Sequence, residues 1–307
     1  MLRQITGRLI EAFAALLLMS LVIFLLSRVT GDPVALLLSD SATEADRQML
    51  IEQLHLDQPM WRQYLSFVGN ALQGDFGQSV NAGRQDALDL VMSRLPASIS
   101  LAAVALAFTL VVGIAMGVVA AVTRGSWIDV LVRVIALLGQ SVPSFWLGIV
   151  LIYIVSVKWG LLPTSGYGTW QHYILPALTL GTFTLAAVTR LVRASMLDAL
   201  GSEYVKLARV KGVSEATVIF KHALSNSLIP VVTFMGAFFA TMITGAVVVE
   251  TVFAWPGIGR LAYESIVSRD FPVIQTVVLV ITAMFILANF AVDMLYLAID
   301  PRMRDAG

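Results

Sequence analysis

The chain has 307 residues, of which 58% are hydrophobic and only 13% are charged. An ordinary soluble domain carries about 25% charged residues, and a mean hydropathy of +0.84 leaves more apolar surface than a water-soluble fold could hide. Twenty basic residues balance twenty acidic ones, which argues against a nucleic-acid-binding protein. Without cysteine, the chain has no disulfide, thiol nucleophile or thiolate metal site. The composition therefore predicts a polytopic membrane protein.

Six stretches are apolar and long enough to cross a bilayer, since a spanning helix needs about 20 mostly apolar residues. They predict an all-α protein in which residues 1–307 form one transmembrane domain. The expected transmembrane helices are 9–28, 97–123, 133–157, 173–190, 227–249 and 273–298. The first is not followed by a small-x-small cleavage site, which favours a retained helix over a signal peptide.

The distribution of basic residues orients these helices. With the N-terminus in the cytoplasm, the inner segments hold 12 basic and 6 acidic residues. The outer segment between Arg28 and Arg94 holds 5 basic and 9 acidic residues. Cytoplasmic loops of membrane proteins are enriched in Lys and Arg, so we expect both termini in the cytoplasm.

The periplasmic loop expected at 29–96 contains two Gly-Asp turns, Gly31-Asp32-Pro33 and Gly74-Asp75-Phe76-Gly77. Between them, apolar residues at helical spacing predict a helix from Thr43 to Leu54, with Thr43 as its N-cap. Two interpretations stay open and can both hold. The loop is a cap that packs on the helix bundle, or a platform for a partner outside the membrane.

The inner segment 198–225 is far longer than the 2–8 residues that usually connect two helices. It predicts two short helices, Ser202–Lys211 and Ser214–Leu224, with Gly212 in the left-handed conformation that ends the first and Ser214 as N-cap of the second. The second helix is expected to carry one apolar face, and the first a cationic rim. The face comprises Ala216, Ile219, Phe220, Ala223 and Leu224, and the rim comprises Lys206, Arg209 and Lys211. Such an element lies on lipid or docks into a partner's groove.

The sequence gives no sign of chemistry within this chain. It lacks a G-x-x-x-x-G-K-[ST] phosphate-binding loop, and its histidines, His55, His172 and His222, fall in different segments. The ionisable residues within the expected spans are Glu11 and Asp293, both close to a cytoplasmic end, where pairing with an arginine or snorkelling accounts for them. We expect a non-catalytic chain without a metal or cofactor of its own.

The third expected helix is interrupted in its apolar middle. Pro143 breaks the ladder of helix hydrogen bonds, and Gln140 and Ser141 are polar groups that need a cavity or a helix neighbour. This region is either a packing kink or a break that lines a translocation pathway. On the second interpretation the candidate pathway residues are Gln140, Ser141, Pro143, Phe145 and Trp146.

The inner segment carries a motif that resembles the cytoplasmic motif of ABC importer permeases, and more narrowly that of the first permease subunit of the dipeptide, oligopeptide and nickel importers. The motif runs from Glu203 to Gly212 and continues through His222-Ala223-Leu224, Asn226 and Pro230. Other matching stretches follow the same order along nearly the whole chain. They are Gly31-Asp32-Pro33, Gly74-Asp75-Phe76-Gly77-x-Ser79, Ser141-Val142-Pro143-Ser144-Phe145-Trp146, Leu162-Pro163-x-x-Gly166, Val249-Glu250-x-Val252-Phe253-x-Trp255-Pro256-Gly257-x-Gly259, Arg269-Asp270-x-Pro272 and Asp300-Pro301-Arg302.

Two departures from the general importer motif are typical of the peptide branch. The acidic residue expected six positions before the glycine is Lys206, and the closing proline is displaced to Pro230, while Ala208 and Gly212 match.

The resemblance implies the type I importer fold, in the bacterial inner membrane and surrounded by lipid. The implied partners are a second homologous permease, two ATPase subunits that bind ATP and Mg²⁺, and an extracellular or periplasmic substrate-binding protein. The inner segment then becomes a coupling helix that seats in an ATPase groove, so that closure of the ATPase dimer turns the pathway outward. The residues to which the resemblance assigns this coupling role are Glu203, Tyr204, Lys206, Ala208, Arg209, Lys211, Gly212, Val213 and Ser214.

The resemblance leaves the substrate open, because peptide, glutathione, nickel-chelate and opine importers share these motifs. From the residues alone, a self-sufficient secondary carrier is the alternative function.

Overall fold

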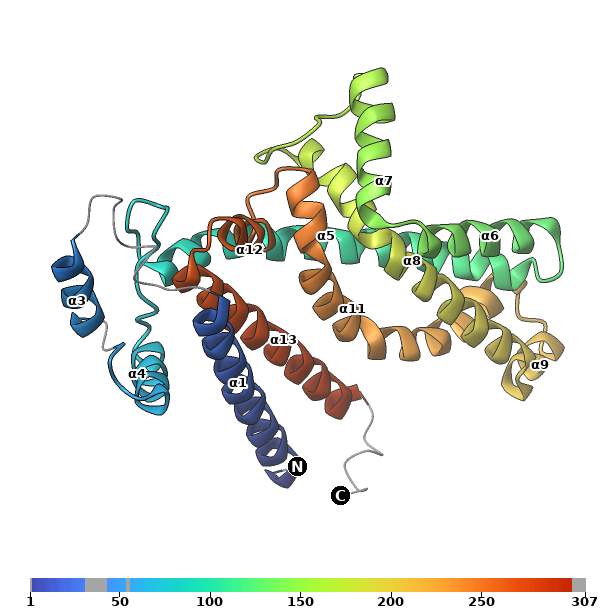
Figure 1. Ribbon diagram of the computed structural model, residues 1–307. Coiled ribbons are helices and arrows are strands. Elements are labelled where there is room, and N and C mark those ends of the chain that lie inside the picture. Colours follow the sequence, from blue (N-terminus) through green and yellow to red (C-terminus); the bar gives the residue numbers. More distant parts are fainter. Residues whose placement is uncertain (1, 31–42, 54–55, 300–307) are drawn as a thin grey trace. The chain divides into compact units, whose positions relative to one another are not determined.

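The computed structural model describes residues 2–30, 43–53 and 56–299 of the chain (Figure 1). Within these residues all regular secondary structure is helical, and the only strand-like feature is an isolated bridge between Gln78 and Asp86. The helices are α1 (Leu2–Thr30), α3 (Glu44–Gln53), α4 (Met60–Leu72), α5 (Ala87–Val122), α6 (Trp127–Ser141), α7 (Ser144–Leu151), η1 (Ile152–Lys158), α8 (Trp170–Gly201), α9 (Glu203–Val210), α10 (Glu215–Thr217), η2 (Val218–Leu224), α11 (Ser225–Val252), α12 (Ile258–Val267) and α13 (Phe271–Ile299). The predicted all-α class is confirmed.

Five segments of the described chain are single helices long and apolar enough to cross a membrane, and a bent pair makes a sixth candidate. The five are Thr6–Val29, Ala87–Val122, Trp170–Gly201, Glu215–Val252 and Phe271–Ala291. The pair is Trp127–Ser141 with Ser144–Lys158. Each of the six contains or overlaps one of the apolar stretches found in the sequence, because the same run of apolar side chains that favours the bilayer is long enough to form a helix of about 20 residues.

The interruption predicted at Pro143 is present and is larger than a kink. The two halves of the pair meet at an angle of 105°. Val142, which precedes the proline, has an extended conformation with φ −85° and ψ 127°, and Pro143 follows with ψ 134°. A proline disfavours helical dihedrals in the residue before it, so two consecutive residues leave the helix and the chain changes direction between Ser141 and Ser144.

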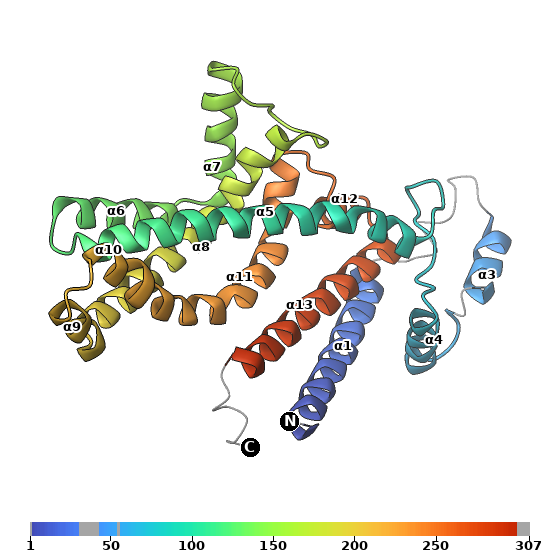
Figure 2. The ribbon, with the colours of Figure 1, turned by 180° about the vertical axis from the view of Figure 1, so that it is seen from behind.

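The described chain divides into two compact units. The first contains the described residues up to Ser98 together with Pro256–Leu287, and the second contains Ile99–Trp255 and the described residues from Ala288 on. In the second unit α8 is the central helix and packs against α6, α7 and α11. Its core joins residues of α5, α8, η2 and α11, among them Val118, Val192, Met196, Ala223 and Val231. The turn from α5 into α6 and the sharp break between α6 and α7 are visible in both views (Figures 1 and 2).

Two glycines let α5 approach α8 closely. A Cβ atom on Gly113 would lie 2.8 Å from Cγ1 of Val188, and one on Gly117 would lie 2.6 Å from Cβ of Val192. Contacts this short are not compatible with a side chain, so the G-x-x-x-G spacing is required by packing, as small residues generally are at membrane helix interfaces.

In the first unit α12 and α13 pack on the beginning of α5, around Val91, Ile258, Leu261 and Val277. The helix α1 contacts both α13 and the outer segment. Gln275 Nε2 donates to Ser27 Oγ at 2.8 Å, and the ring of Tyr64 on α4 meets Phe24 of α1 at a centroid distance of 5.5 Å. The helix predicted from Thr43 to Leu54 is observed as α3, whereas Leu54 itself and Gly31-Asp32-Pro33 lie outside the described residues.

The segment after α4 returns to the turn between α12 and α13. Ser79 Oγ donates to the buried carboxylate of Asp270 at 2.5 Å, and the Asn81 backbone N–H donates to the same oxygen at 3.3 Å. Part of the outer segment therefore packs on the helices of its own unit, as the cap interpretation expects.

Candidate functional site

The inner segment between α8 and α11 folds as two short helical pieces around a tight turn. The first piece, α9, ends at Val210, and the second begins at Glu215 as α10 and continues as the π-helix η2. Gly212 has φ +78°, the left-handed conformation predicted for it. Ser214 caps the second piece, because its hydroxyl accepts a hydrogen bond from the Thr217 N–H at 3.4 Å.

A surface ion pair joins the two sides of the turn. Arg209 Nε and Nη2 donate to the two carboxylate oxygens of Glu215, at 3.1 and 2.5 Å. This bidentate hydrogen bond raises the pKa of the Arg209 guanidinium above its ordinary value. Because the two residues flank Gly212, the pair joins the end of α9 to the start of α10. A second pair, Lys206 with Glu203 at 2.7 Å, lies along α9 itself.

The apolar residues of this segment do not form the single face that the sequence predicted. Ala223 is fully buried against the α8 core, whereas Phe220 is 62% exposed. The reason is that Val218–Leu224 is π-helical, so the number of residues per turn differs from that of an α-helix and the expected α-helical spacing fails. The exposed apolar surface is instead shared by Leu207 and Val210 of α9 and Phe220 of η2.

A buried ion pair lies between α6 and α8. The Asp129 carboxylate is 2% exposed and accepts from Arg193 Nε and Nη2, both at 2.8 Å, and from the Gly125 N–H at 3.1 Å. Arg133 Nε lies 3.2 Å from the same carboxylate. Asp129 is therefore hydrogen-bonded to the α5–α6 turn and to two arginines, one of them on α8.

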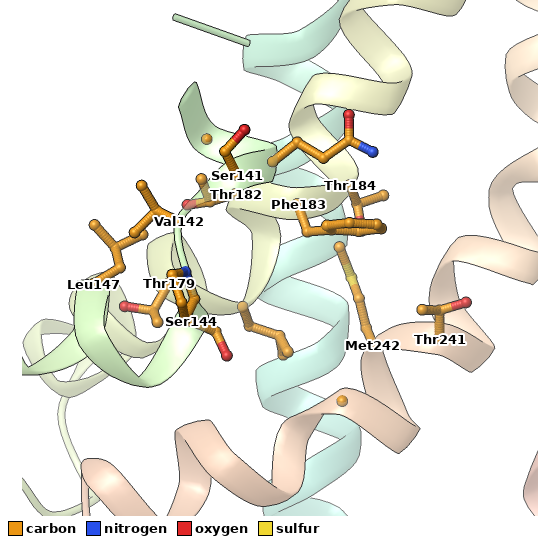
Figure 3. Close-up of a pocket in the computed structure, with 15 residues that line it drawn as sticks. Ser141, Val142, Ser144, Leu147, Thr179, Thr182, Phe183, Thr184, Thr241 and Met242 are labelled. Atoms are coloured by element: carbon orange, nitrogen blue, oxygen red, sulfur yellow. The ribbon is translucent and has the colours of Figure 1, made fainter. Parts of the chain in front are cut away.

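A cavity of about 340 Å³ opens beside the break between α6 and α7. Side chains from α6, α7, α8 and α11 surround it (Figure 3). Its polar lining residues are Gln140, Ser141, Ser144, Thr179, Thr182, Thr184 and Thr241, and none of its lining residues is charged. The remaining side chains are apolar, with Phe183 and Met242 among them. The volume falls within the range of about 300–1,000 Å³ that is typical of small-molecule sites.

Comparisons with known proteins agree on one family. Residues 113–305 match the family of the binding-protein-dependent transport system inner membrane component, and residues 1–102 match the N-terminal part of such membrane components. The chain belongs to this family. It is a non-catalytic permease subunit of an ABC importer and a multi-pass protein of the inner membrane, and a subunit of this kind is expected to hold no cofactor.

Relatives of the permease align over its whole length. It is 43% identical over 305 residues, 99% of both chains, to the glutathione transport system permease protein GsiC of Escherichia coli K12 and, with the same figures, to GsiC of Shigella dysenteriae. The fold is similar to that of inward-facing MetNI methionine ABC transporter structures, with a TM-score of 0.59, 21% identity and coverage of 69% of this chain and 96% of the other. An amino acid ABC transporter with histidines gives a TM-score of 0.52 at 16% identity, covering 70% and 94%.

The cavity contains some of the pathway residues predicted from the sequence and not others. Gln140, Ser141 and Pro143 line it. Phe145 and Trp146 are not among its lining residues, and each is 52% exposed. The structure thus brings the polar candidates together with the threonines of α8 and leaves the two aromatic side chains on the surface of α7.

The predicted coupling residues all lie on or beside the turn of the inner segment. Seven of them, from Glu203 to Gly212, occupy α9 and its end, while Val213 and Ser214 lead into α10. Tyr204 accepts a hydrogen bond from Asn226 Nδ2 at 3.0 Å, which ties α9 to the start of α11.

Sequence reasoning did not predict the burial of three carboxylates of the permease, those of Asp129, Glu250 and Asp270. Asp129 was counted only as a cytoplasmic charge, because its partner Arg193 is 64 residues away in the chain. Glu250 lies one residue beyond the expected end of the fifth span and is completely buried in α11. Acidic residues next to apolar runs were the available signal, since such residues are rarely buried without partners.

Proposed function

We propose that this permease forms one half of a translocation pathway with a second homologous permease, and that both of its termini are cytoplasmic. For the membrane crossings we keep the bounds expected from the sequence, of which the third, 133–157, overlaps the bent pair Trp127–Ser141 with Ser144–Lys158. Two ATPase subunits dock on the inner face, and a substrate-binding protein docks outside. The family supports binding-protein dependence, and the 12 basic against 6 acidic residues of the inner segments support the orientation.

The observation that carries the coupling role is the surface at the α9–α10 turn. Leu207, Val210 and Phe220 are exposed apolar side chains on a segment braced by the Arg209–Glu215 pair. An apolar surface held in one conformation by hydrogen bonds is suited to docking in a partner's groove, because little conformational entropy is lost on binding. The segment is joined directly to α8 and to α11, so that movement of the docked partner is transmitted to both helices.

The substrate class we propose is a small peptide or peptide-like solute. The names of the GsiC relatives point to glutathione transport in those proteins. Dipeptides, nickel chelates and opines are the other solutes that the same mechanism accommodates, and the selecting subunit in each case is the binding protein.

Uptake into proteoliposomes tests the function. We expect the complex of this permease with its partner permease and ATPases to import radiolabelled glutathione or a dipeptide only when ATP is inside with the ATPases and the binding protein is outside. Omission of the binding protein or replacement of ATP by ADP are the controls. Solute movement by the purified chain alone, without ATP, would contradict the proposal and favour a self-sufficient carrier.

A further inference from the structure

The cavity beside the α6–α7 break presents hydrogen-bonding groups whose roles can be assigned atom by atom. Four of its hydroxyl groups already donate within their own helices. Thr179 Oγ1 donates to the Leu175 carbonyl at 2.8 Å, and Thr182 Oγ1 donates to the Leu178 carbonyl at 2.6 Å. Ser141 and Thr241 do the same, to Leu137 and Ala237, respectively. A hydroxyl has one proton and two acceptor lone pairs, so these four groups can offer a ligand only acceptor positions.

Three further polar side chains of the cavity are not engaged. In the part of the chain that the structure describes, no hydrogen bond is found for the side chains of Gln140, Ser144 or Thr184. Thr184 is the most informative of them, because it is only 3% exposed and yet lines the cavity (Figure 3). The Thr184 hydroxyl is not among the fully buried unpaired atoms, unlike that of Thr189, so it is open to the cavity and can bond a group that enters there.

The pattern of donors and acceptors specifies what such a group must be. The acceptor positions of the threonines suit an N–H or ammonium donor, and the Gln140 amide and the Ser144 and Thr184 hydroxyls can both donate and accept. That combination matches a peptide bond, which carries one N–H and one C=O. None of the lining residues is charged, so the cavity has no ion pair with which to select the charge of a side chain.

We propose that this cavity is a subsite for the backbone amide of the transported solute, in which the Thr184 hydroxyl accepts a hydrogen bond from the peptide N–H. This inference rests on the proposed function and deepens it. The subsite holds the solute by the part that all peptides share. Selection among side chains is then left to other components of the importer.

The substitution Thr184→Val tests the subsite, since valine keeps the shape of threonine and removes the hydroxyl. Thr189→Val is the matched control. Thr189 lies on the same helix, is 1% exposed and has an unpaired hydroxyl, but it does not line the cavity. In proteoliposomes with saturating loaded binding protein, we expect Thr184→Val to lower peptide import per ATP hydrolysed about tenfold, the factor for one lost hydrogen bond of about 1.4 kcal/mol. Thr189→Val should stay within about twofold of the wild type.

The probe peptides separate amide recognition from a structural defect. Alanylalanine and its analogue methylated on the peptide nitrogen are each delivered at a concentration that saturates the binding protein. We expect Thr184→Val to reduce import of alanylalanine and to leave import of the N-methyl analogue at its wild-type value. Assembly of each variant complex is checked by size-exclusion chromatography.

The outcomes separate the subsite from the proposed substrate class. Equal losses for both threonine variants, or equal losses for both peptides, would overturn the subsite and indicate a structural role for the hydroxyl. Wild-type import rates in the Thr184→Val complex would overturn it as well. A wild-type complex that imports neither glutathione nor alanylalanine would instead contradict the peptide substrate class.

Discussion

The carboxylate of Asp129 receives two parallel hydrogen bonds from the guanidinium of Arg193, each 2.8 Å long. The pair is largely shielded from solvent and joins the first turn of α6 to the C-terminal half of α8. Since α8 leads into α9, the pair connects the N-terminal end of the bent helix pair to the helix that precedes the turn at Gly212. We expect α6 and α8 to move together when the permease changes conformation.

Removal of one partner of this pair leaves a buried charge without compensation. We expect Asp129→Leu or Arg193→Met to lower the free energy of unfolding by about 3–5 kcal/mol each. The double variant Asp129→Leu/Arg193→Met should be less destabilised than the sum of the single changes. Thermal unfolding of the purified complex measures the loss of stability in each variant. Glu11→Gln is the control and should have little effect, because the Arg8–Glu11 pair is exposed and 3.5 Å long. Additive single effects would show that the pair is not coupled.

The coupling role proposed for the turn at Gly212 can be tested without straining the backbone. A Cβ on Gly212 meets no atom within 4 Å, so a side chain there projects away from the chain. Asparagine tolerates the left-handed conformation, so Gly212→Asn should leave thermal stability unchanged. We expect this variant to continue to hydrolyse ATP and to import several-fold less solute per ATP. Gly125→Asn is the matched control, since Gly125 has φ +80° and equally open space in another turn. Similar import defects in both variants would contradict a specific docking role.

The Arg209–Glu215 pair predicts a reversible uncoupling. Arg209→Glu places two carboxylates at the turn, and their repulsion should open it. We expect ATP hydrolysis without import in this variant and recovery of import in Arg209→Glu/Glu215→Arg, which restores a pair of opposite charge. The ratio of solute imported to ATP hydrolysed is measured in the same proteoliposome preparations. Failure of the exchanged pair to recover any import would show that Arg209 acts through a direct contact instead.

The close approach of α5 and α8 predicts a size limit at Gly117. We expect Gly117→Ala to lower the free energy of unfolding by about 1–3 kcal/mol, because the added Cβ overlaps Val192. The same substitution at Gly69, a helical glycine with open space around its Cβ, should be neutral or slightly stabilising. Thermal unfolding of the two variants decides the question. Equal stability of the Gly117→Ala and Gly69→Ala variants would contradict the close packing of α5 on α8.

The proposed orientation can be tested by labelling, because the natural chain has no cysteine. Single cysteines at Gln85 and Glu203 occupy exposed positions in the outer and inner segments. We expect a membrane-impermeant maleimide to label Gln85→Cys in intact spheroplasts and Glu203→Cys only after the membrane is opened. The opposite pattern would reverse the topology.

Much of the local structure was predictable because it depends on local conformational preferences. The helical class follows from apolar runs of about 20 residues, and the turn at Gly212 from the freedom of glycine at positive φ. Proline alone did not decide the size of the break at Pro143, since Pro96, Pro176 and Pro230 lie inside helices. The prediction of one apolar face on the second short helix was wrong, because nothing in the composition of Val218–Leu224 indicates a π-helix.

By itself, the sequence determined that this protein is a helical membrane permease with a long, structured segment between α8 and α11, since hydropathy and turn preferences act over short stretches of chain. Only the tertiary structure decided which groups meet. Asp129 and Arg193 are 64 residues apart, and the cavity combines side chains of α6, α7, α8 and α11. Contacts between residues so far apart in the chain depend on the 105° change of direction at the break and on the close packing of α5 with α8 at Gly113 and Gly117. The direction in which a side chain points is set by the packing of whole helices, and no local pattern of residues encodes it.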